Sequence, residues 1–366
     1  MYNMSILSYF SKMNDPRVDR TKFHNLEDIV FIAIASVLSG AETWNDMEDY
    51  GNQKKEWLKT ILELPNGIPS HDTFNRFFSA LDPNEFEDCF LDWVKDISNI
   101  TQGEVVSIDG KTICGSRNQG FKSATHIVSA WADKNQLILG QIKVDDKSNE
   151  ITAIPKLLDA LLLDGAIVTL DAMGCQKHIA KMIIDKNADY ILAVKENQPD
   201  LFDDIQDSFR ILPPDNEYQD VDYGHGRIET RKTSIITDLS LVETSSKWLR
   251  LTSIVRIQRH RHFKATGKEE QETSYYISSF NDVEKIHAGI RKHWGIENKV
   301  HWILDVAFNE DHSRKRNENA AQNYSCLNRI ALNLLKKDQS IKRGIKGKRL
   351  NAAWNNNYLM KLLKDI

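Results

Sequence analysis

The sequence predicts an α/β protein whose mixed β-sheet follows an all-α N-terminal region and contains an inserted antiparallel β-region. Three features indicate this architecture. The first hundred residues show the spacing of amphipathic helices, residues 104–194 alternate strand-length apolar runs with helical segments, and residues 217–280 contain several β-type segments. The length of 366 residues also favours two or three domains, at about 150 residues each.

Helices are expected throughout the first hundred residues. An apolar segment at 26–38 ends at a Ser-Gly pair that is typical of a helix C-terminus, and a second helix is expected at 43–62. Ser70 is a candidate N-cap for a third helix, whose phenylalanines form one apolar stripe, and a fourth helix spans 84–97. Short helices joined by tight turns leave two interpretations open: a DNA-binding helix-turn-helix, or a bundle that only packs on the next domain.

Strands dominate the next part of the chain. Apolar runs at 104–109, 124–132 and 136–144 are separated by short turns and predict three consecutive antiparallel strands. The chain then alternates between the two element types, with a helix at 151–163, a strand at 166–170, a helix at 176–186, a strand at 190–194 and a helix through Phe209. This β-β-β-α-β-α-β-α order defines the ribonuclease-H-like fold, a mixed sheet covered by helices.

A β-rich stretch at 217–280 interrupts this alternation and predicts an inserted antiparallel sheet. Helices are expected again at 283–293, 296–306 and 320–337. The predicted domains are therefore a helical region over 1–100, an α/β domain over 101–337 that contains the insertion, and a basic tail over 338–366.

Charge is distributed unevenly along the chain. The formal net charge is −4, yet residues 227–268 hold ten Lys and Arg against three Asp and Glu, and residues 336–366 hold nine against two. A local excess of this kind is what a phosphate-binding surface needs, whereas chance clustering on a solvated surface is the alternative.

Several classes of protein are disfavoured. No apolar run reaches the ~18 residues of a membrane span, and the N-terminus lacks the apolar region of a secretory signal, so we expect a cytoplasmic protein. Four distant cysteines without a Cys-x-x-Cys pair argue against a disulfide framework and a structural zinc site. The sequence has no Gly-rich phosphate loop, HExxH or GxSxG motif, which disfavours nucleotide binding, zinc peptidases and serine hydrolases.

Aspartates follow two of the predicted strands. Asp109 ends the first strand in SIDGKT, and Asp171 ends the fourth in VTLDAMGCQ. These strands are neighbours in the predicted fold, so the two carboxylates would meet at one sheet edge and repel each other unless a cation lies between them. Mg²⁺ takes oxygen ligands of this kind and often binds through one or two carboxylates together with a substrate phosphate. The alternative is that both aspartates are ordinary turn residues.

A third carboxylate is expected after the insertion. In HWGIENKVHWILD, Glu297, His301 and Asp305 are four residues apart and share one face of a helix, although an ordinary helix with a wet face has the same pattern. Glu310 and Asp311 compete for the role. We favour Glu297, because it lies early in the helix that must return from the insertion to the sheet edge.

The stretches SIDGKT, DAMGCQ and HWGIEN, in this order and spacing, form a highly specific combination. Stretches such as LPNGIPSHDTFNRFFSALDP and RGIKGKRLNAAWN add to this combination, and together these stretches extend over almost the whole chain. In all of them the sequence resembles insertion-sequence transposases of the DDE class, close to the H-repeat-associated group. The resemblance implies an N-terminal associated domain and a ribonuclease-H-like catalytic domain with a β-rich insertion, in which Asp109, Asp171 and Glu297 are the catalytic, metal-binding carboxylates.

The same resemblance implies the chemistry. Two Mg²⁺ (or Mn²⁺) ions about 4 Å apart activate a water and stabilise the leaving 3′ oxygen during cleavage at a transposon end. The freed 3′-OH then attacks target DNA. The implied partner is double-stranded DNA, with a dimer expected in the DNA complex, no membrane, and association with the bacterial nucleoid when DNA is bound.

One departure from the family pattern affects the DNA contacts. Related transposases carry a Tyr-x2-Arg-x3-Glu-x6-Lys signature around the third acid, whereas the matching positions here are Ile290, His293 and Leu304. Other basic residues are therefore the expected DNA contacts: Lys111, Lys195, Arg227, Arg231, Arg291 and Lys299.

The leading interpretation is an active DNA transposase. Two alternatives stay open. One is a catalytically silent, transposase-derived DNA-binding protein. The other is a metal-dependent nuclease that shares the site and lacks the strand-transfer step.

Overall fold

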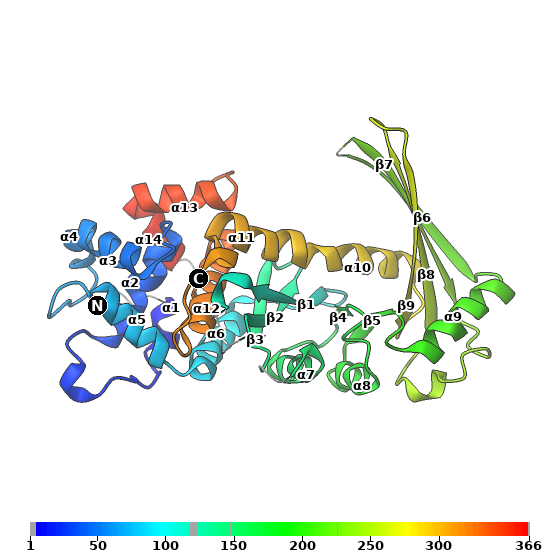
Figure 1. Cartoon of the computed structure of the whole chain (residues 1–366), viewed down its shortest axis with the longest axis horizontal. Coiled ribbons are helices and arrows are strands. Elements are labelled where there is room, and N and C mark those ends of the chain that lie inside the picture. The colour runs from blue at the N-terminus through cyan, green and yellow to red at the C-terminus, as the bar shows by residue number, and fades with distance from the viewer. Residues whose placement is uncertain (1–4, 118–122, 146–147, 225, 365–366) are drawn as a thin grey trace.

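The computed structural model describes residues 5–117, 123–145, 148–224 and 226–364 (Figure 1). The helices are α1 (Ser5–Phe10), α2 (Leu26–Leu38), α3 (Trp44–Gln53), α4 (Lys55–Leu58), α5 (His71–Ala80), α6 (Pro83–Ile97), α7 (Glu150–Ala160), α8 (Lys177–Asp185), α9 (Pro199–Ile211), α10 (Val283–Ile296), α11 (Trp302–Phe308), α12 (Ala320–Lys337), α13 (Ile345–Trp354) and α14 (Asn356–Lys364). The strands are β1 (Val105–Ile113), β2 (Thr125–Ala132), β3 (Leu137–Lys143), β4 (Ile167–Leu170), β5 (Asp189–Val194), β6 (Asn216–Gly224), β7 (Arg227–Ile236), β8 (Ser253–Phe263) and β9 (Glu269–Ser278).

All these strands belong to one mixed sheet, in the order β3-β2-β1-β4-β5-β9-β8-β7-β6. The pairs β1–β4 and β4–β5 are parallel, and the other neighbours are antiparallel. The region predicted as an insertion does form antiparallel strands. It is not a separate sheet, however, because its last strand, β9, pairs with β5 and extends the main sheet.

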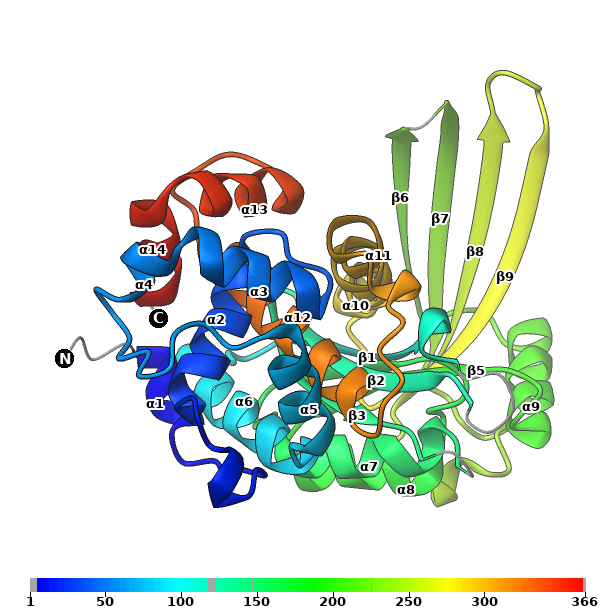
Figure 2. The same cartoon turned by 60° about the vertical axis from the view of Figure 1, so that its left-hand side comes forward.

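Helices cover both faces of the β1–β5 part of the sheet. Helices α7 and α8 pack on one face, while α10 crosses β1, β4 and β5 on the other (Figure 1). The ends of β6–β9 project beyond these layers, so that the outer strands stand away from the helical part of the molecule (Figure 2). The described part of the chain has no helix with both the length and the apolarity that a membrane crossing requires.

The expected apolar stripe after Ser70 forms as predicted. Ser70 caps α5, and Phe74, Phe77 and Phe78 are completely buried. The helix expected at 43–62 is instead two short helices, because the backbone at Lys54 (φ −101°, ψ 10°) leaves helical geometry between α3 and α4. In the described part of residues 5–97, the regular elements are all helices.

The N-terminal helices share their core with the C-terminal helices. Helix α12 packs on α2, α5 and α6 as well as on β3, and α13 and α14 pack on α2. The Arg349 side chain, on α13, donates hydrogen bonds to the carbonyl oxygens of Val37 and Ala41 at the end of α2. The basic segment 338–366 therefore contributes two packed helices in its described part.

The two helices predicted on either side of Trp294 and Gly295 form one continuous helical rod. Helix α10 passes through Gly295 without a break and runs into a π-helical turn, Glu297–His301, which leads directly into α11. A buried stripe of Ile296, Val300 and Leu304 continues along the rod and holds it against the rest of the protein. The π-helical turn lies beside the sheet edge where the predicted acids are found.

Candidate active site

Asp109 and Asp171 occupy equivalent positions on neighbouring strands. Ile108 of β1 pairs in register with Leu170, the last residue of β4, so each aspartate comes directly after a paired residue. Because the two strands are parallel, both side chains lie at the same edge of the sheet. They line one cleft of about 1290 Å³, and Glu297 lines it too. The structure thus brings all three sequence-predicted acids to one cleft.

Glu297 is brought to Asp109 by the π-helical turn. One ligand atom each of Asp109, Glu297 and His301 lies within 4.8 Å of the other two. His301 Nδ1 is 3.2 Å from Glu297 Oε2 and 3.5 Å from Asp109 Oδ2. The sequence pattern placed His301 on the same helix face as Glu297 but assigned it no role.

A fourth carboxylate, Glu150, was missed by the sequence analysis. It is the first residue of α7, and its Oε1 lies 2.7 Å from His126 Nε2 on β2. The backbone of Gly110 passes so close that a Cβ added there would lie 2.1 Å from Glu150 Oε1 and 2.5 Å from His126 Nε2. A larger residue beside Asp109 would therefore displace the side chains of Glu150 and His126. An acid in the first turn of a helix is so common that nothing in the sequence marked Glu150 as special.

Burial and neighbouring carboxylates raise the pKa of the two aspartates of the cleft. Burial raises the pKa of Asp109 to about 7, and the negative charges of Glu150, Asp171 and Glu297 act in the same direction. Burial also raises the pKa of Asp171, with a further contribution from Glu150. Two aspartates whose ionised form is disfavoured in this way offer oxygen ligands to a divalent cation, whose charge would relieve the repulsion.

His301, which is buried, and His293, which is partly buried, are held in the neutral form. Burial lowers the pKa of His301 to about 3 and that of His293 to about 4. His293 Nδ1 lies 3.0 Å from the Thr169 hydroxyl on β4, which donates in turn to Ser107 on β1. His293 stands where related transposases carry arginine, and here it ties the rod to the two strands that position the aspartates.

The three acids that competed with Glu297 have other partners. The Lys111 ammonium lies 2.7 Å from the Asp305 carboxylate. Glu310 is buried and paired with Arg329 at 3.0 Å. Asp311 accepts a hydrogen bond from a backbone amide, that of residue 114. None of these three lines the cleft in the described residues.

The predicted DNA contacts Lys111 and Lys195 differ in their surroundings. Lys111 is buried, and its ammonium forms an ion pair with Asp305. Lys195 lines the cleft with Asp171, and within the described ranges it forms no ion pair. Of the two, Lys195 is the one whose ammonium is free for a phosphate.

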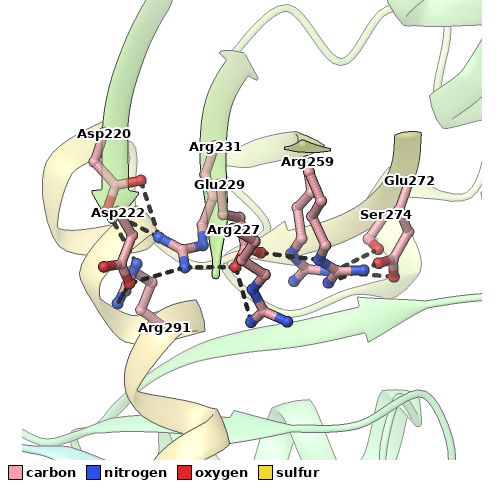
Figure 3. A network of polar contacts seen from close by, with 10 residues as sticks. Asp220, Asp222, Arg227, Glu229, Arg231, Arg259, Glu272, Ser274 and Arg291 are labelled. Carbon is pink, nitrogen blue, oxygen red and sulfur yellow. Dashed lines mark hydrogen bonds and ion pairs between the residues drawn. The ribbon is translucent and has the colours of Figure 1, made fainter. Parts of the chain in front are cut away.

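Three further predicted DNA contacts lie in one network of ion pairs (Figure 3), namely Arg227, Arg231 and Arg291. Arg231 is 3.1 Å from Glu229 and 3.3 Å from Asp220. Arg291, on α10, lies 3.1 Å from the same Asp220, and Arg227 lies 3.2 Å from Glu229. The remaining predicted contact, Lys299, is 2.6 Å from Asp133. These four cations are therefore already paired with carboxylates in the DNA-free protein.

The basic run 227–268 is balanced by its neighbours in the sheet. Strands β6 and β9 flank it and carry acids, so residues 216–278 hold ten Lys and Arg against nine Asp and Glu. Cross-strand pairs result, such as Arg259 with Glu272 at 3.1 Å (Figure 3). The run 227–268 alone overestimates the positive charge of this surface, because the compensating acids lie on β6 and β9, partly outside that run.

Cations without partners are found instead at the start of α13. Lys342, Arg343 and Lys346 are exposed, and within the described ranges none of them pairs with a carboxylate. They surround the first turn of α13, whose N-cap, Gly344, provides no side-chain hydrogen bond. Free backbone amides at a helix N-terminus add to the positive potential there.

Comparison with known proteins agrees with these features. The family model for a transposase DDE domain matches residues 100–334, and the model for the DDE-transposase-associated region matches residues 7–94. "Putative transposase YncI" of Escherichia coli O157:H7 is 41% identical over 98% of this chain and 94% of its own length. "H repeat-associated putative transposase YhhI" of Escherichia coli K12 is 39% identical over 98% of this chain and 97% of its own length. Both parts of the resemblance inferred from the sequence are thereby confirmed, and the chain belongs to the DDE transposase family, together with H-repeat-associated relatives.

Proposed function

We propose that this protein is an active DNA transposase that cleaves phosphodiesters at transposon ends and joins the freed 3′-OH to target DNA. The observation that carries the proposal is the convergence of Asp109, Asp171 and Glu297 on one cleft. Three neighbouring acids repel one another, and DNA binding alone does not need them. Their presence therefore favours an active enzyme over a silent DNA-binding descendant.

The residues in and beside the cleft have different proposed roles. Asp109 and Glu297, with Asp171 at the end of the neighbouring strand, are the carboxylates that would hold Mg²⁺ or Mn²⁺. Bound ions of this class lower the pKa of a water and stabilise the leaving 3′ oxygen. Lys195 has a free ammonium in the same cleft and is suited to hold the phosphate being attacked. Glu150 strengthens the negative potential at Asp109 and Asp171.

The order of the first five strands supports the assignment of the catalytic part as ribonuclease-H-like. In this sheet, three antiparallel strands are followed by two parallel ones, in the order β3-β2-β1-β4-β5. We propose a division into a helical region over 1–100, a catalytic domain over 101–337 and a basic segment over 338–366. Because α12 packs on the N-terminal helices, the helical region and the catalytic domain share one core. The proposed division therefore separates functions and does not separate independently packed domains.

Double-stranded DNA is the proposed partner, with a dimer assembling when two ends are brought together. The free cations at the start of α13 and Lys195 are available for phosphates in the DNA-free protein. Arg227, Arg231, Arg291 and Lys299 would have to exchange their carboxylate partners for phosphates. We therefore expect α13 to contribute more to the first encounter with DNA than the insertion does.

The test is incubation of the purified protein with the element's own end DNA and Mg²⁺ or Mn²⁺. Nicked, hairpin and joined products are expected from the wild type. Glu297→Gln should abolish them while leaving end-DNA binding within a few-fold, whereas Asp305→Asn, a matched change on the same helical rod, should retain cleavage. Cleavage without joining would assign the chain as a nuclease. Binding without cleavage, under all metals, would assign it as a silent DNA-binding protein.

A further inference from the structure

His301 occupies a position that the family pattern does not account for. It follows Glu297 by one turn of the helical rod, and its imidazole points to the gap between the Glu297 and Asp109 carboxylates. The side chain is 5% exposed, whereas that of Glu297 is 57% exposed. A polar ring has thus been buried underneath the two acids.

The distances around His301 match those of ligands on one ion. In an octahedral site with metal–ligand distances near 2.1 Å, adjacent ligand atoms are about 3 Å apart. His301 Nδ1 lies 3.2 Å and 3.5 Å from one oxygen of each acid. Only small side-chain adjustments would bring the three atoms to an ion between them.

The protonation of the ring distinguishes two roles for His301. Nδ1 faces the carboxylates of Glu297 and Asp109, whereas Nε2 is buried and has no hydrogen-bond partner in the described residues, as is also true of His287 Nε2. A ring that only positions Glu297 carries its proton on Nδ1 and donates it to the carboxylate. A ring that binds an ion through Nδ1 must carry its proton on Nε2 instead.

The local helix geometry supports a functional role. The five residues from Glu297 to His301 form a π-helical turn within an otherwise α-helical rod. Such turns cost hydrogen-bond geometry and occur frequently at functional sites. Here the turn places both Glu297 and His301 beside Asp109 of β1.

We propose that His301 is a third protein ligand, through Nδ1, of the divalent ion that Asp109 and Glu297 hold. The inference rests on the proposed metal-dependent function and goes beyond it, because it assigns one ion a mixed set of two carboxylates and an imidazole. Imidazole nitrogen favours transition metals over Mg²⁺. This site should therefore prefer Mn²⁺ to Mg²⁺ more strongly than a site built from carboxylates alone.

The experiment is pulsed electron paramagnetic resonance of Mn²⁺ bound to the full-length protein. Electron spin echo modulation from a directly bound ¹⁴N nucleus is expected in the wild type, and growth with ¹⁵N-labelled histidine should replace it with the ¹⁵N pattern. His301→Asn should remove the nitrogen modulation and weaken Mn²⁺ binding at least about tenfold, with a smaller loss for Mg²⁺. His287→Gln is the control, since His287 is equally buried on the same rod and hydrogen-bonded to Thr233, and it should keep the modulation.

The outcomes separate this inference from the proposed function. Mn²⁺ binding without nitrogen modulation would overturn the assignment of His301 and leave the carboxylate site standing. Absence of any Mn²⁺ binding in the wild type would overturn both. Should His301→Asn fail to fold, the isotope exchange in the wild-type protein still decides whether any histidine binds the ion, and absence of the ¹⁵N pattern overturns the assignment.

Discussion

The three free cations at the start of α13 lead to a quantitative prediction about DNA binding. Replacing Lys342, Arg343 and Lys346 together by glutamine removes exposed charges that have no carboxylate partner in the described residues. Each phosphate contact contributes about 0.9 to the slope of log K against log salt concentration. The triple variant should therefore have a slope shallower by about 2.7 than the wild type.

This slope has a direct experimental consequence. When the salt concentration rises from 50 to 200 mM, the wild type should lose about 40 times more of its affinity for DNA than the variant does. Fluorescence anisotropy with labelled end DNA, measured over this range, gives both slopes. Since the replaced side chains are exposed, the stability of the fold should change by less than about 0.5 kcal/mol, which a thermal melt checks.

A matched control separates local contacts from net charge. Lys95, Lys181 and Arg210 are also exposed, but each is paired with an acid on its own helix. Replacing these three by glutamine changes the net charge equally and should leave the slope almost unchanged. Equal slopes for the two triple variants would refute the assignment of α13 as a DNA-binding element.

Three further predictions concern the insertion and the cleft. Arg231→Gln should lower the unfolding free energy by ~1–2 kcal/mol in urea titrations, because the largely buried Arg231 pairs with both Asp220 and Glu229, whereas the more exposed Arg227→Gln should cost under about 1 kcal/mol; equal losses would contradict this prediction. Because the pKa of Asp109 is raised to about 7, protonation of its carboxyl stabilises the metal-free fold at low pH, and this contribution is lost as pH rises through 7. Between pH 4 and 8, the unfolding free energy of the metal-free wild type should therefore fall by ~2–4 kcal/mol relative to that of Asp109→Asn. If the difference in unfolding free energy between the two proteins does not change with pH, the pKa of Asp109 is not raised. Gly110→Ala forces the carboxylate of Glu150 aside and should reduce cleavage at least about tenfold in a protein with an unchanged circular dichroism spectrum.

The sequence was informative where local pattern and tertiary structure agree. Asp109 and Asp171 follow apolar runs that are buried strands, and a carboxylate directly after such a strand has to lie at the sheet edge. Glu297 and Asp305 share one helix face, so the choice of Glu297 over Asp305 used its early place in the helix together with the family resemblance of HWGIEN. In the structure, Asp305 is the acid that pairs with Lys111.

The remaining features depend on contacts between distant residues. Nothing in the order of residues shows that Glu150 lies beside Gly110, or that Asp220 on β6 and Arg291 on α10 share an ion pair. The continuity of the rod through Gly295 was missed for a similar reason. A glycine weakens a helix locally, by about 1 kcal/mol, and the burial of the flanking apolar residues outweighs that preference.

The shared core of the two chain ends has a consequence for biosynthesis. Asn323 of α12 bonds to the carbonyl oxygens of Phe78 and Leu81, and Tyr324 bonds to that of Ala41. The N-terminal helices thus emerge from the ribosome well before the helices that complete their core. At about 5–20 residues per second, the more than 200 residues that separate them take at least about ten seconds to synthesise. During that interval α5 lacks the part of its native cover that α12 provides, so the nascent chain should depend on chaperones until α12 has been made.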